Sequence, residues 1–393
     1  MKYPNLLIKK VLSGLGYSVT RKQVSGKILV NVFNTSHNKN ALLSYIRSVF
    51  EGNSKDNRHT NRLKTHTIAE ILNELGYNID VVDCSDDFNG DFGKYDMVIG
   101  LGKSLDHVLK LRDNSSKTKV VWFGTGCNPL FSNPATIKRV ADFYKRHGKL
   151  MLSSSRYIKD DTVLQHEFAD WIILHGSKFA KATFRTENIS TIHAPVFIKH
   201  TVTRSDAEWA AAKQNYIWFG SDGAIHKGLD LVIDTFKELK NCTLHICGQL
   251  ENEKEFFNYY GPVINSAGNI KYHGFVNVES DKFKEILKSC AFVIYPSASE
   301  GNSPAVITCM ANGGLIPIVS ESADVDIDTY GILIKDLTIQ AVNDAVKQSQ
   351  QLSVGELELC SRKIVAETNR VNTFEYFKTD FKAKLQEALN NIK

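Results

Sequence analysis

The stretch SASEGNSPAVITCMANGGLIPIVS (297–320) combines an acidic residue, several small residues and a helical pattern directly after a β-rich apolar run. The run 291–295 stops at Pro296. Helical spacing resumes at Pro304, which suits a first helical turn because its missing N–H would be unpaired there. The free N–H groups of a helix start bind anions, phosphates above all. The stretch therefore predicts an anion-binding loop above the end of a strand.

A second candidate for an anion site is WFGSDGAIHKGLDLVIDTF (218–236). A strand ends at Gly220, a short polar loop follows, and Lys227 and Gly228 open an amphipathic helix. A cation beside the exposed N–H groups of a helix start adds the point charge that a diphosphate needs. Ordinary helix capping explains the same Lys-Gly pair, and this alternative stays open.

Two further strand ends offer free backbone groups in the same half of the chain. CTLHICGQ (242–249) is a strand that ends in a glycine turn, and KYHGFVNVES (271–280) ends in the tripeptide Gly274-Phe275-Val276. The order of these segments along the chain matters more than any one of them, because each motif alone is weak.

Composition indicates a globular protein of two domains. The chain has 393 residues, of which 42% are apolar and 23% charged. No apolar run reaches the roughly 18 residues of a membrane-spanning helix, and the apolar core of the N-terminus is too short for a signal peptide. The seven cysteines are an odd number without a CxxC pair, which favours buried reduced thiols over a disulfide framework or metal site. We expect a cytoplasmic protein.

The charge is distributed unevenly. Residues 1–200 carry 11 more basic than acidic side chains, residues 201–393 carry six fewer, and no acidic residue precedes Glu51. The basic cluster 137–149, with Phe143 and Tyr144, could rest on an anionic membrane surface or form a solvated helix face. No nucleic-acid-binding pattern is visible, so we expect no nucleic-acid partner.

Strand and helix patterns alternate along the chain as in parallel sheets. The pattern predicts a first strand at 27–33, a helix at 41–50, and a linker within 193–215, after which the alternation starts afresh. The fold class is therefore α/β, with two Rossmann-like, doubly wound domains facing a central cleft. The domains are expected as follows: a basic N-terminal extension at 1–26, a first Rossmann-like domain at 27–199, a second at 200–372, and a C-terminal helix at 373–393 that packs back on the first domain.

In this order and spacing, the four motifs resemble the donor half of glycosyltransferase family 4, retaining enzymes of bacterial polysaccharide synthesis with the GT-B fold. The shared pattern is a strand with a Lys-Gly helix start, a strand ending in Gly, Gly-Phe-Val, and a Glu-Gly loop. Here a turn at 310–313 and the strand residues 317–319 complete it. The resemblance covers about 215–335 and is thin in the first half.

The resemblance implies roles for individual residues. Lys227 would contact the donor diphosphate, Glu300 would accept hydrogen bonds from the transferred sugar, and these two are the candidate catalytic residues. The donor-binding set is Gly220, Ser221, Lys227, Gly274, Phe275, Val276, Glu300, Gly301, Asn302, Ser303 and Thr308. Within it, Gly301, Asn302, Ser303 and the first helical amides would cradle the phosphates.

Two positions depart from the family pattern. Ser221 stands where the family usually has a diphosphate-binding Arg, and Thr308 replaces the second Glu, which holds the ribose. A neutral hydroxyl contributes less to a hydrogen bond than a charged partner. The departures mark either altered donor contacts or a degenerate site.

The implied reaction transfers a sugar from a nucleotide sugar, a UDP-sugar ahead of a GDP-sugar, to a hydroxyl of a glycan or lipid-linked acceptor. Lys227 and the helix start would stabilise the departing diphosphate, so no metal or other cofactor is expected. The pair Asp324 and Asp326 follows the strand 315–320, outside the cleft pattern, and is expected in a solvated loop.

The first domain is expected to bind the acceptor. The loop 34–38 follows the predicted first strand, so His37 is a tentative catalytic residue in the cleft, with an ordinary exposed histidine as the alternative. His175 and the segment 124–126 end other strands on the same rim. The basic N-terminus suggests an acceptor at a membrane, and hence peripheral association with its inner face.

Functions of other classes stay open. A non-catalytic scaffold that binds a nucleotide sugar is compatible with Ser221 and Thr308, and a GT-B-like nucleotide-sugar epimerase shares the architecture. A dehydrogenase is disfavoured because no G-x-G-x-x-G follows a strand with an acidic residue about 20 positions on. Donor hydrolysis or sugar transfer separates the enzymes from the scaffold.

Overall fold

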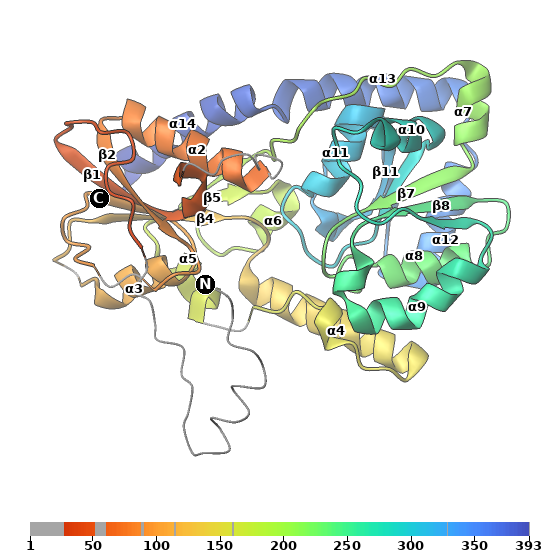
Figure 1. The fold of residues 1–393 in the computed structure, drawn as a ribbon, viewed down its shortest axis with the longest axis horizontal. Coiled ribbons are helices and arrows are strands. Elements are labelled where there is room, and N and C mark those ends of the chain that lie inside the picture. The colour runs from red at the N-terminus through yellow and green to blue at the C-terminus, as the bar shows by residue number, and fades with distance from the viewer. Residues whose placement is uncertain are drawn as a thin grey trace.

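The computed structural model describes residues 27–51, 60–87, 90–113, 115–158, 161–327 and 329–392. The expected basic extension, 1–26, lies outside these residues. Within them, the chain forms two α/β domains, each built on a six-stranded sheet, which lie side by side in Figure 1. No helix in the described part of the chain has the length and apolar character to cross a membrane.

The first sheet is parallel throughout and has the strand order β2-β1-β3-β4-β5-β6. Its strands are β1 (Lys39–Tyr45), β2 (Tyr77–Asp83), β3 (Met97–Gly100), β4 (Lys119–Gly124), β5 (Trp171–His175) and β6 (Ile189–Ile192). The connecting helices are η1 (Arg47–Phe50), α2 (Thr60–Glu74), α3 (Lys103–Leu111), α4 (Pro129–His147), η2 (Leu152–Ser154), η3 (Asp161–Leu164), α5 (Gln165–Phe168) and α6 (Lys178–Ala182). Side chains of the central strands alternate between two buried clusters, so both faces of the sheet are covered.

The predictions for the first strand and the first helix are wrong. Residues 27–33 make only an isolated antiparallel bridge, from Leu29 to Val81, and Asn31 and Asn34 have φ of 46° and 52°, which prevents an extended strand. The first strand is β1, which overlaps the first half of the stretch expected to be helical. Residues 41–45 are all buried, so β1 lacks the apolar-polar alternation that marks a half-exposed strand.

The second sheet is also parallel and has the order β12-β11-β10-β7-β8-β9. Its strands are β7 (Asn215–Phe219), β8 (Thr243–Cys247), β9 (Ile270–Tyr272), β10 (Phe292–Tyr295), β11 (Ile316–Ser320) and β12 (Ile332–Ile334). The helices are α7 (Asp206–Ala212), α8 (Leu229–Phe236), η4 (Leu250–Asn252), α9 (Lys254–Ser266), α10 (Asp281–Ser289), α11 (Pro304–Gly313), η5 (Glu321–Ala323), α12 (Ile339–Ser349), α13 (Val354–Val371) and α14 (Phe374–Asn391). All seven cysteines are free, and five of them are buried, as expected.

The last two helices span both domains along one side of the molecule (Figure 1). Helix α13 packs against α11 and α7 of the second domain, and α14 packs against α2, β5 and β6 of the first. Between the two helices, Asn372 accepts a hydrogen bond from Val196 N (2.9 Å) and donates one to Ala194 O (2.8 Å). The chain therefore returns to the first domain beside the segment by which it left.

Helix α4 joins the two domains through a buried ion cluster. It begins in the first domain, but Val140 and Phe143 belong to the apolar core of the second. Arg139 Nη2 lies 2.7 Å from a carboxylate oxygen of Asp230 on α8, and Arg146 Nη1 lies 2.8 Å from Asp234. Arg139 and Asp230 are at most 1% exposed. The basic cluster 137–149 is therefore not a single membrane-facing or solvated face, because two arginines and Phe143 lie inside this contact.

Replacing Asp230 by Ala should lower the free energy of unfolding by about 3–5 kcal/mol, because it leaves the buried Arg139 without its charge partner. Urea unfolding measures the change. Glu367→Ala is the control, since Glu367 pairs with Arg370 at 2.6 Å on the surface and its loss should cost less than about 1 kcal/mol. Equal losses of unfolding free energy in the two variants would contradict the conclusion that this buried ion cluster stabilises the contact between the domains.

Candidate functional site

The loop that follows β10 is wedged between the two domains. Glu300 N donates to Ser322 O (2.9 Å) in the second domain, and Glu300 O accepts from Cys127 N (3.3 Å) in the first. A Cβ on Gly301 would overlap His175 O and the Cα of Gly126, so only glycine fits this close approach. The glycine of the predicted loop is thus explained by contact with the opposite domain.

Asp324 holds the loop in place. Its carboxylate accepts hydrogen bonds from Asn302 N (2.9 Å), Ser177 N (2.7 Å) and Ala180 N (3.0 Å), and the residue is 1% exposed. The expectation of a solvated loop at Asp324 is therefore wrong. One buried carboxylate thus links the loop 300–303 of the second domain to the start of α6 in the first, through charge-assisted hydrogen bonds.

The amides at the start of α11 are only partly free. Asn302 N is bound to Asp324, and Ser303 N donates to Ala323 O (3.3 Å), so these two do not cradle a phosphate in this structure as the sequence predicted. The amides of Gly301, Ala305 and Val306 have no hydrogen-bond partner among the described residues. An anion at this helix start would meet Ala305 and Val306, since Pro304 has no N–H.

The four sequence motifs converge on one pocket of about 380 Å³. Each lies at a carboxyl end of a strand or at the start of α11, which is where open parallel sheets bind ligands. The predicted residues Gly220, Ser221, Phe275, Val276 and Thr308 line it, together with Thr60, Phe197, Phe219, Asp222, Cys247, Gly248, Gln249, Val278, Pro304 and Ala305. Gly274 lies directly behind this wall, with φ of 65° and its carbonyl bound to Gly248 N (2.9 Å). This pocket is the candidate nucleotide pocket.

Glu300 lines a neighbouring polar cavity of about 170 Å³ between the domains. Its walls include Thr125 and Gly126 of the first domain, which were predicted to lie at the rim of the cleft. Arg156 and His226, which the sequence did not single out, also line it. His226 Nε2 lies 2.8 Å from Ser299 O, and its Nδ1 is buried without a partner. Burial lowers the pKa of His226, so the neutral ring donates from Nε2 and leaves the buried Nδ1 as an acceptor without a partner. We call this cavity the Glu300 cavity.

Lys227 lines neither pocket but interacts with one residue of each, Ser221 of the nucleotide pocket and Glu300 of the Glu300 cavity. It is 3% exposed, and its Nζ donates to Ser221 Oγ (2.9 Å). Burial lowers the pKa of Lys227 to about 8, although Glu300 opposes this effect. A Cβ on the next residue, Gly228, would overlap Pro296 O, and φ there is 70°, so the Lys-Gly pair needs its glycine.

Glu300 is ionised in this arrangement. Burial raises its pKa, but the charges of Lys227 and Arg156 and the hydroxyl of Ser297 outweigh burial and lower the pKa below its usual value. An ionised carboxylate only accepts hydrogen bonds. Glu300 is therefore suited to bind hydroxyl groups of a ligand in the cavity, and it is already held by Ser297 Oγ (3.1 Å).

His37 does not lie in the cleft. Its loop precedes β1 and so lies at the amino end of the parallel strands, opposite the Glu300 cavity, with His37 Nε2 3.0 Å from Asn73 Oδ1. The prediction placed it wrongly because the first strand was assigned to 27–33.

A buried lysine that the sequence did not single out lies in α2. Lys64 is 2% exposed, and burial lowers its pKa to about 7. The pattern of apolar residues along α2 does not reveal that this lysine is buried.

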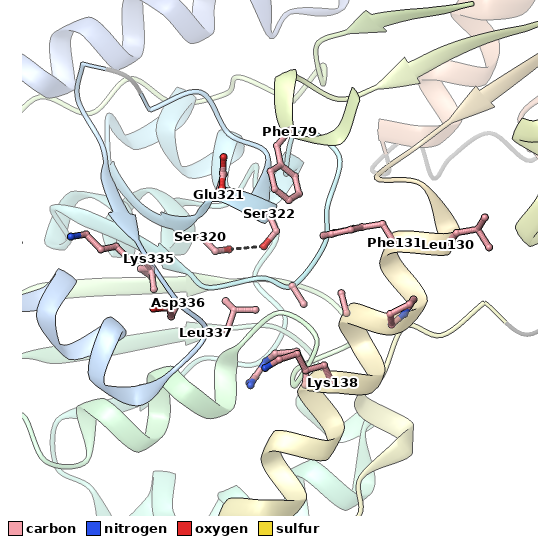
Figure 2. Close-up of a pocket in the computed structure, with 15 residues that line it drawn as sticks. Leu130, Phe131, Lys138, Phe179, Ser320, Glu321, Ser322, Lys335, Asp336 and Leu337 are labelled. Carbon is pink, nitrogen blue, oxygen red and sulfur yellow. Dashed lines mark hydrogen bonds between the residues drawn. The ribbon is translucent and has the colours of Figure 1, made fainter. Parts of the chain in front are cut away.

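A further pocket, of about 520 Å³, lies on the other side of α4 (Figure 2). Figure 2 shows Phe131 and Phe179 of the first domain facing Ser322 and Leu337 of the second. None of the predicted donor-site residues lines it. Among the described residues, no three His, Cys, Asp or Glu side chains gather as a metal site.

Comparisons with known proteins agree with this architecture. Residues 213–350 match the family model "Glycosyl transferases group 1". Sucrose-phosphate synthase from Thermosynechococcus elongatus aligns with a TM-score of 0.62 and 13% identity over 90% of this chain and 99% of that one. The lipopolysaccharide outer core galactosyltransferase WaaB gives 0.56 and 12% over 89% and 99%. HepE of Anabaena, solved with UDP and glucose, gives 0.54 and 12% over 90% and 99%.

At these identities the structural likeness shows the fold, which is the GT-B arrangement of two Rossmann-like domains. The family match covers the second domain from β7 to α12, where the four motifs lie. No curated protein matches the chain in sequence.

Binding of a nucleotide sugar should weaken as the pH rises through about 8. Lys227 is charged below its pKa of about 8 and neutral above it, so its attraction for a diphosphate is lost by up to about tenfold per pH unit. Calorimetric titration between pH 7 and 10 measures the profile. Lys227→Met keeps the buried stem without the charge and should bind weakly with a flat profile. Parallel profiles in the two proteins would refute this role for Lys227.

Proposed function

We propose that the protein is a retaining glycosyltransferase that moves a sugar from a nucleotide sugar, in the first instance a UDP-sugar, to an acceptor hydroxyl. The observation that carries the proposal is the convergence of four separate motifs on the nucleotide pocket, with the buried Lys227 bonded to Ser221 of that pocket and acted on by the charge of Glu300. The base and ribose occupy the nucleotide pocket, the diphosphate crosses Ser221 and Lys227, and the sugar enters the Glu300 cavity. The group 1 glycosyl transferase match over 213–350 supports this arrangement.

In the proposed reaction, the bond between the anomeric carbon and the β-phosphate oxygen breaks, and its electron pair stays on the diphosphate. The acceptor oxygen bonds to the anomeric carbon and gives up its proton to an oxygen of the departing diphosphate. Lys227 and the free amides of Ala305 and Val306 stabilise the charge on the leaving diphosphate, which is the usual source of rate enhancement in such sites. Glu300 binds hydroxyls of the transferred sugar. In this proposal the reaction proceeds without a metal, and Lys227 and these amides face the diphosphate directly.

The acceptor in this proposal is a glycan or lipid-linked glycan of the cell surface. It enters from the first domain, whose residues Thr125 and Gly126 close one side of the Glu300 cavity. The HepE structure that shares this fold was solved with UDP-glucose as well as with UDP, and WaaB acts in the lipopolysaccharide outer core. These neighbours motivate the choice of a UDP-sugar and of a cell-surface acceptor for the first assays.

Two alternatives make different predictions. A non-catalytic scaffold would bind the nucleotide sugar without hydrolysing or transferring it, which suits the neutral Ser221 and Thr308. A nucleotide-sugar epimerase would convert the donor without any acceptor. Thr308 lines the nucleotide pocket, and its hydroxyl donates to Pro304 O (2.7 Å).

The donor site is tested by thermal unfolding of the protein with a panel of nucleotides and nucleotide sugars. A UDP-sugar at 100 times its dissociation constant should stabilise the protein by about 2.7 kcal/mol. Lys227→Met should lose the stabilisation by UDP and UDP-sugar alike. Glu300→Gln should lose part of the stabilisation by the UDP-sugar and none of that by UDP, because Glu300 contacts only the sugar.

No shift with any nucleotide would overturn the proposed donor site. A shift without donor hydrolysis or transfer to any glycan acceptor would establish the scaffold instead, and acceptor-independent sugar conversion would establish the epimerase. In the enzyme, Lys227→Met should lower the turnover number by about 10²- to 10³-fold.

We also propose that the protein docks on an anionic membrane through the outer face of α4 and the segment after it. Ile137, Tyr144, Leu150, Leu152 and Tyr157 are each at least 44% exposed and surround a hollow of about 510 Å³. Lys145 and Lys149 are exposed beside them. Apolar side chains next to lysines suit a membrane interface.

Vesicle sedimentation tests this surface. The protein should bind phosphatidylglycerol vesicles, release from them in high salt, and ignore phosphatidylcholine vesicles. The double variant Lys145→Ala and Lys149→Ala should bind about 30-fold more weakly, at about 1 kcal/mol for each lysine. Wild-type protein that stays in solution with phosphatidylglycerol vesicles would remove the membrane proposal and leave the donor site untouched.

A further inference from the structure

The charges around Lys227 leave the diphosphate position short of positive charge. The ionised or ionisable groups that act on Lys227 are Glu300, Arg156, Glu253 and Asp222. Of these, three are carboxylates and only Arg156 is a cation. Ser221, which receives the Lys227 hydrogen bond, adds no charge. A dianionic diphosphate brought to Lys227 alone would therefore meet more negative than positive charge.

Arg156 reaches this position from the first domain. It follows η2 in the segment after α4, and its backbone is fixed on both sides: Arg156 N donates to Thr136 Oγ1 (3.1 Å), and Ser154 O accepts from His226 N (3.2 Å). The second contact places the segment directly against the loop that carries Lys227. The backbone that presents Arg156 is thus preorganised on the donor side of the second domain.

The side chain of Arg156 crosses the glycine of that loop. A Cβ on Gly223 would lie 2.8 Å from Arg156 Cγ and 2.9 Å from Cδ, and Gly223 has φ of 95°, so glycine is required both for the backbone and for the approach. Gly223 lies between Ser221 of the nucleotide pocket and His226 of the Glu300 cavity. The aliphatic part of the Arg156 side chain therefore lies against the loop 221–226, beside the proposed position of the diphosphate.

The guanidinium group of Arg156 is available to a ligand. Arg156 is exposed, lines the Glu300 cavity with Glu300 and His226, and makes no side-chain hydrogen bond or ion pair with any described residue. Burial is the main cause that lowers the pKa of Lys227, and the charge of Arg156 adds to it, so the two cations are close enough to act on one ligand. Arginine binds phosphate oxygens with two parallel N–H donors.

We propose that Arg156 is the second diphosphate-binding cation of the donor site and that it supplies, from the opposite domain, the charge that Ser221 does not. This inference rests on the proposed donor site. It makes the bound diphosphate a bridge between Arg156 of the first domain and Lys227 of the second. Because arginine stays charged at every accessible pH, the site keeps one cation when Lys227 is neutral.

The test is calorimetric binding of UDP, uridine and inorganic pyrophosphate to the full chain and to five variants, one of which is Lys227→Met. Arg156→Ala should bind UDP and pyrophosphate about 10- to 100-fold more weakly and bind uridine unchanged, because only the phosphates touch the guanidinium. Arg156→Lys should fall in between. Adding Ser221→Arg to Arg156→Ala should restore at least tenfold of the lost affinity, since it returns a cation to the same segment from the other side.

Arg185→Ala is the matched control, because Arg185 is also an exposed arginine of the first domain. It lies in the loop before β6, the edge strand of the first sheet, and does not line the Glu300 cavity. The substitution should change no affinity. Unfolding temperatures of the single Arg156 variants and of Arg185→Ala should stay together, as the Arg156 side chain is exposed and bonds to no described residue.

Failure of the inference and failure of the proposed function give different results. Wild-type affinity for UDP in Arg156→Ala, with weakened binding in Lys227→Met, would overturn the inference and leave the donor site standing. Pyrophosphate binding that depends on Arg156, without binding of any nucleotide, would support the cation pair and overturn the nucleotide-sugar function. Absence of binding by UDP and pyrophosphate alike would overturn both.

Discussion

The position of the loop 300–303 is the constraint on which the rest of the site depends. Its glycine lies against His175 and Gly126 of the opposite domain, and its next amide is bound by the buried Asp324. A buried carboxylate that receives several N–H groups is strongly stabilised in one geometry, and losing any donor leaves charge without compensation. The loop therefore carries the domain contact and the candidate sugar-binding carboxylate together, and neither can move without the other.

Burial of charge gives the site its chemistry. Lys227 is almost fully enclosed, which lowers its pKa towards neutrality, while the same enclosure brings Glu300 near enough for each group to favour the charged form of the other. In such surroundings a diphosphate gains more from each cation than it would in water. The guanidinium of Arg156, exposed at the mouth of the same space, extends this charge towards solvent.

Helix α4 makes the two domains less independent than the sheets alone suggest. Its first turn helps to close the Glu300 cavity, with Ser132 Oγ bound to Ser299 Oγ, and its later turns join the ion cluster around Asp230. The same helix presents its outer, apolar face to solvent. A single element thus connects the candidate sugar site, the domain interface and the surface proposed for membrane docking.

The sequence by itself determined the features that are local in the chain: the α/β class and the four strand-end motifs. These could be predicted because parallel strands end in loops on one edge of the sheet, so motifs spaced along the chain gather in space. The sequence-based prediction failed at β1, because its five buried residues lack the apolar-polar alternation of a half-exposed strand. Since the first strand was predicted too early in the chain, His37 was assigned to the wrong end of the strands. Only the tertiary structure placed Arg156, His226 and Asp324, because their roles come from partners in the other domain or in distant loops, and no spacing along the chain encodes such contacts.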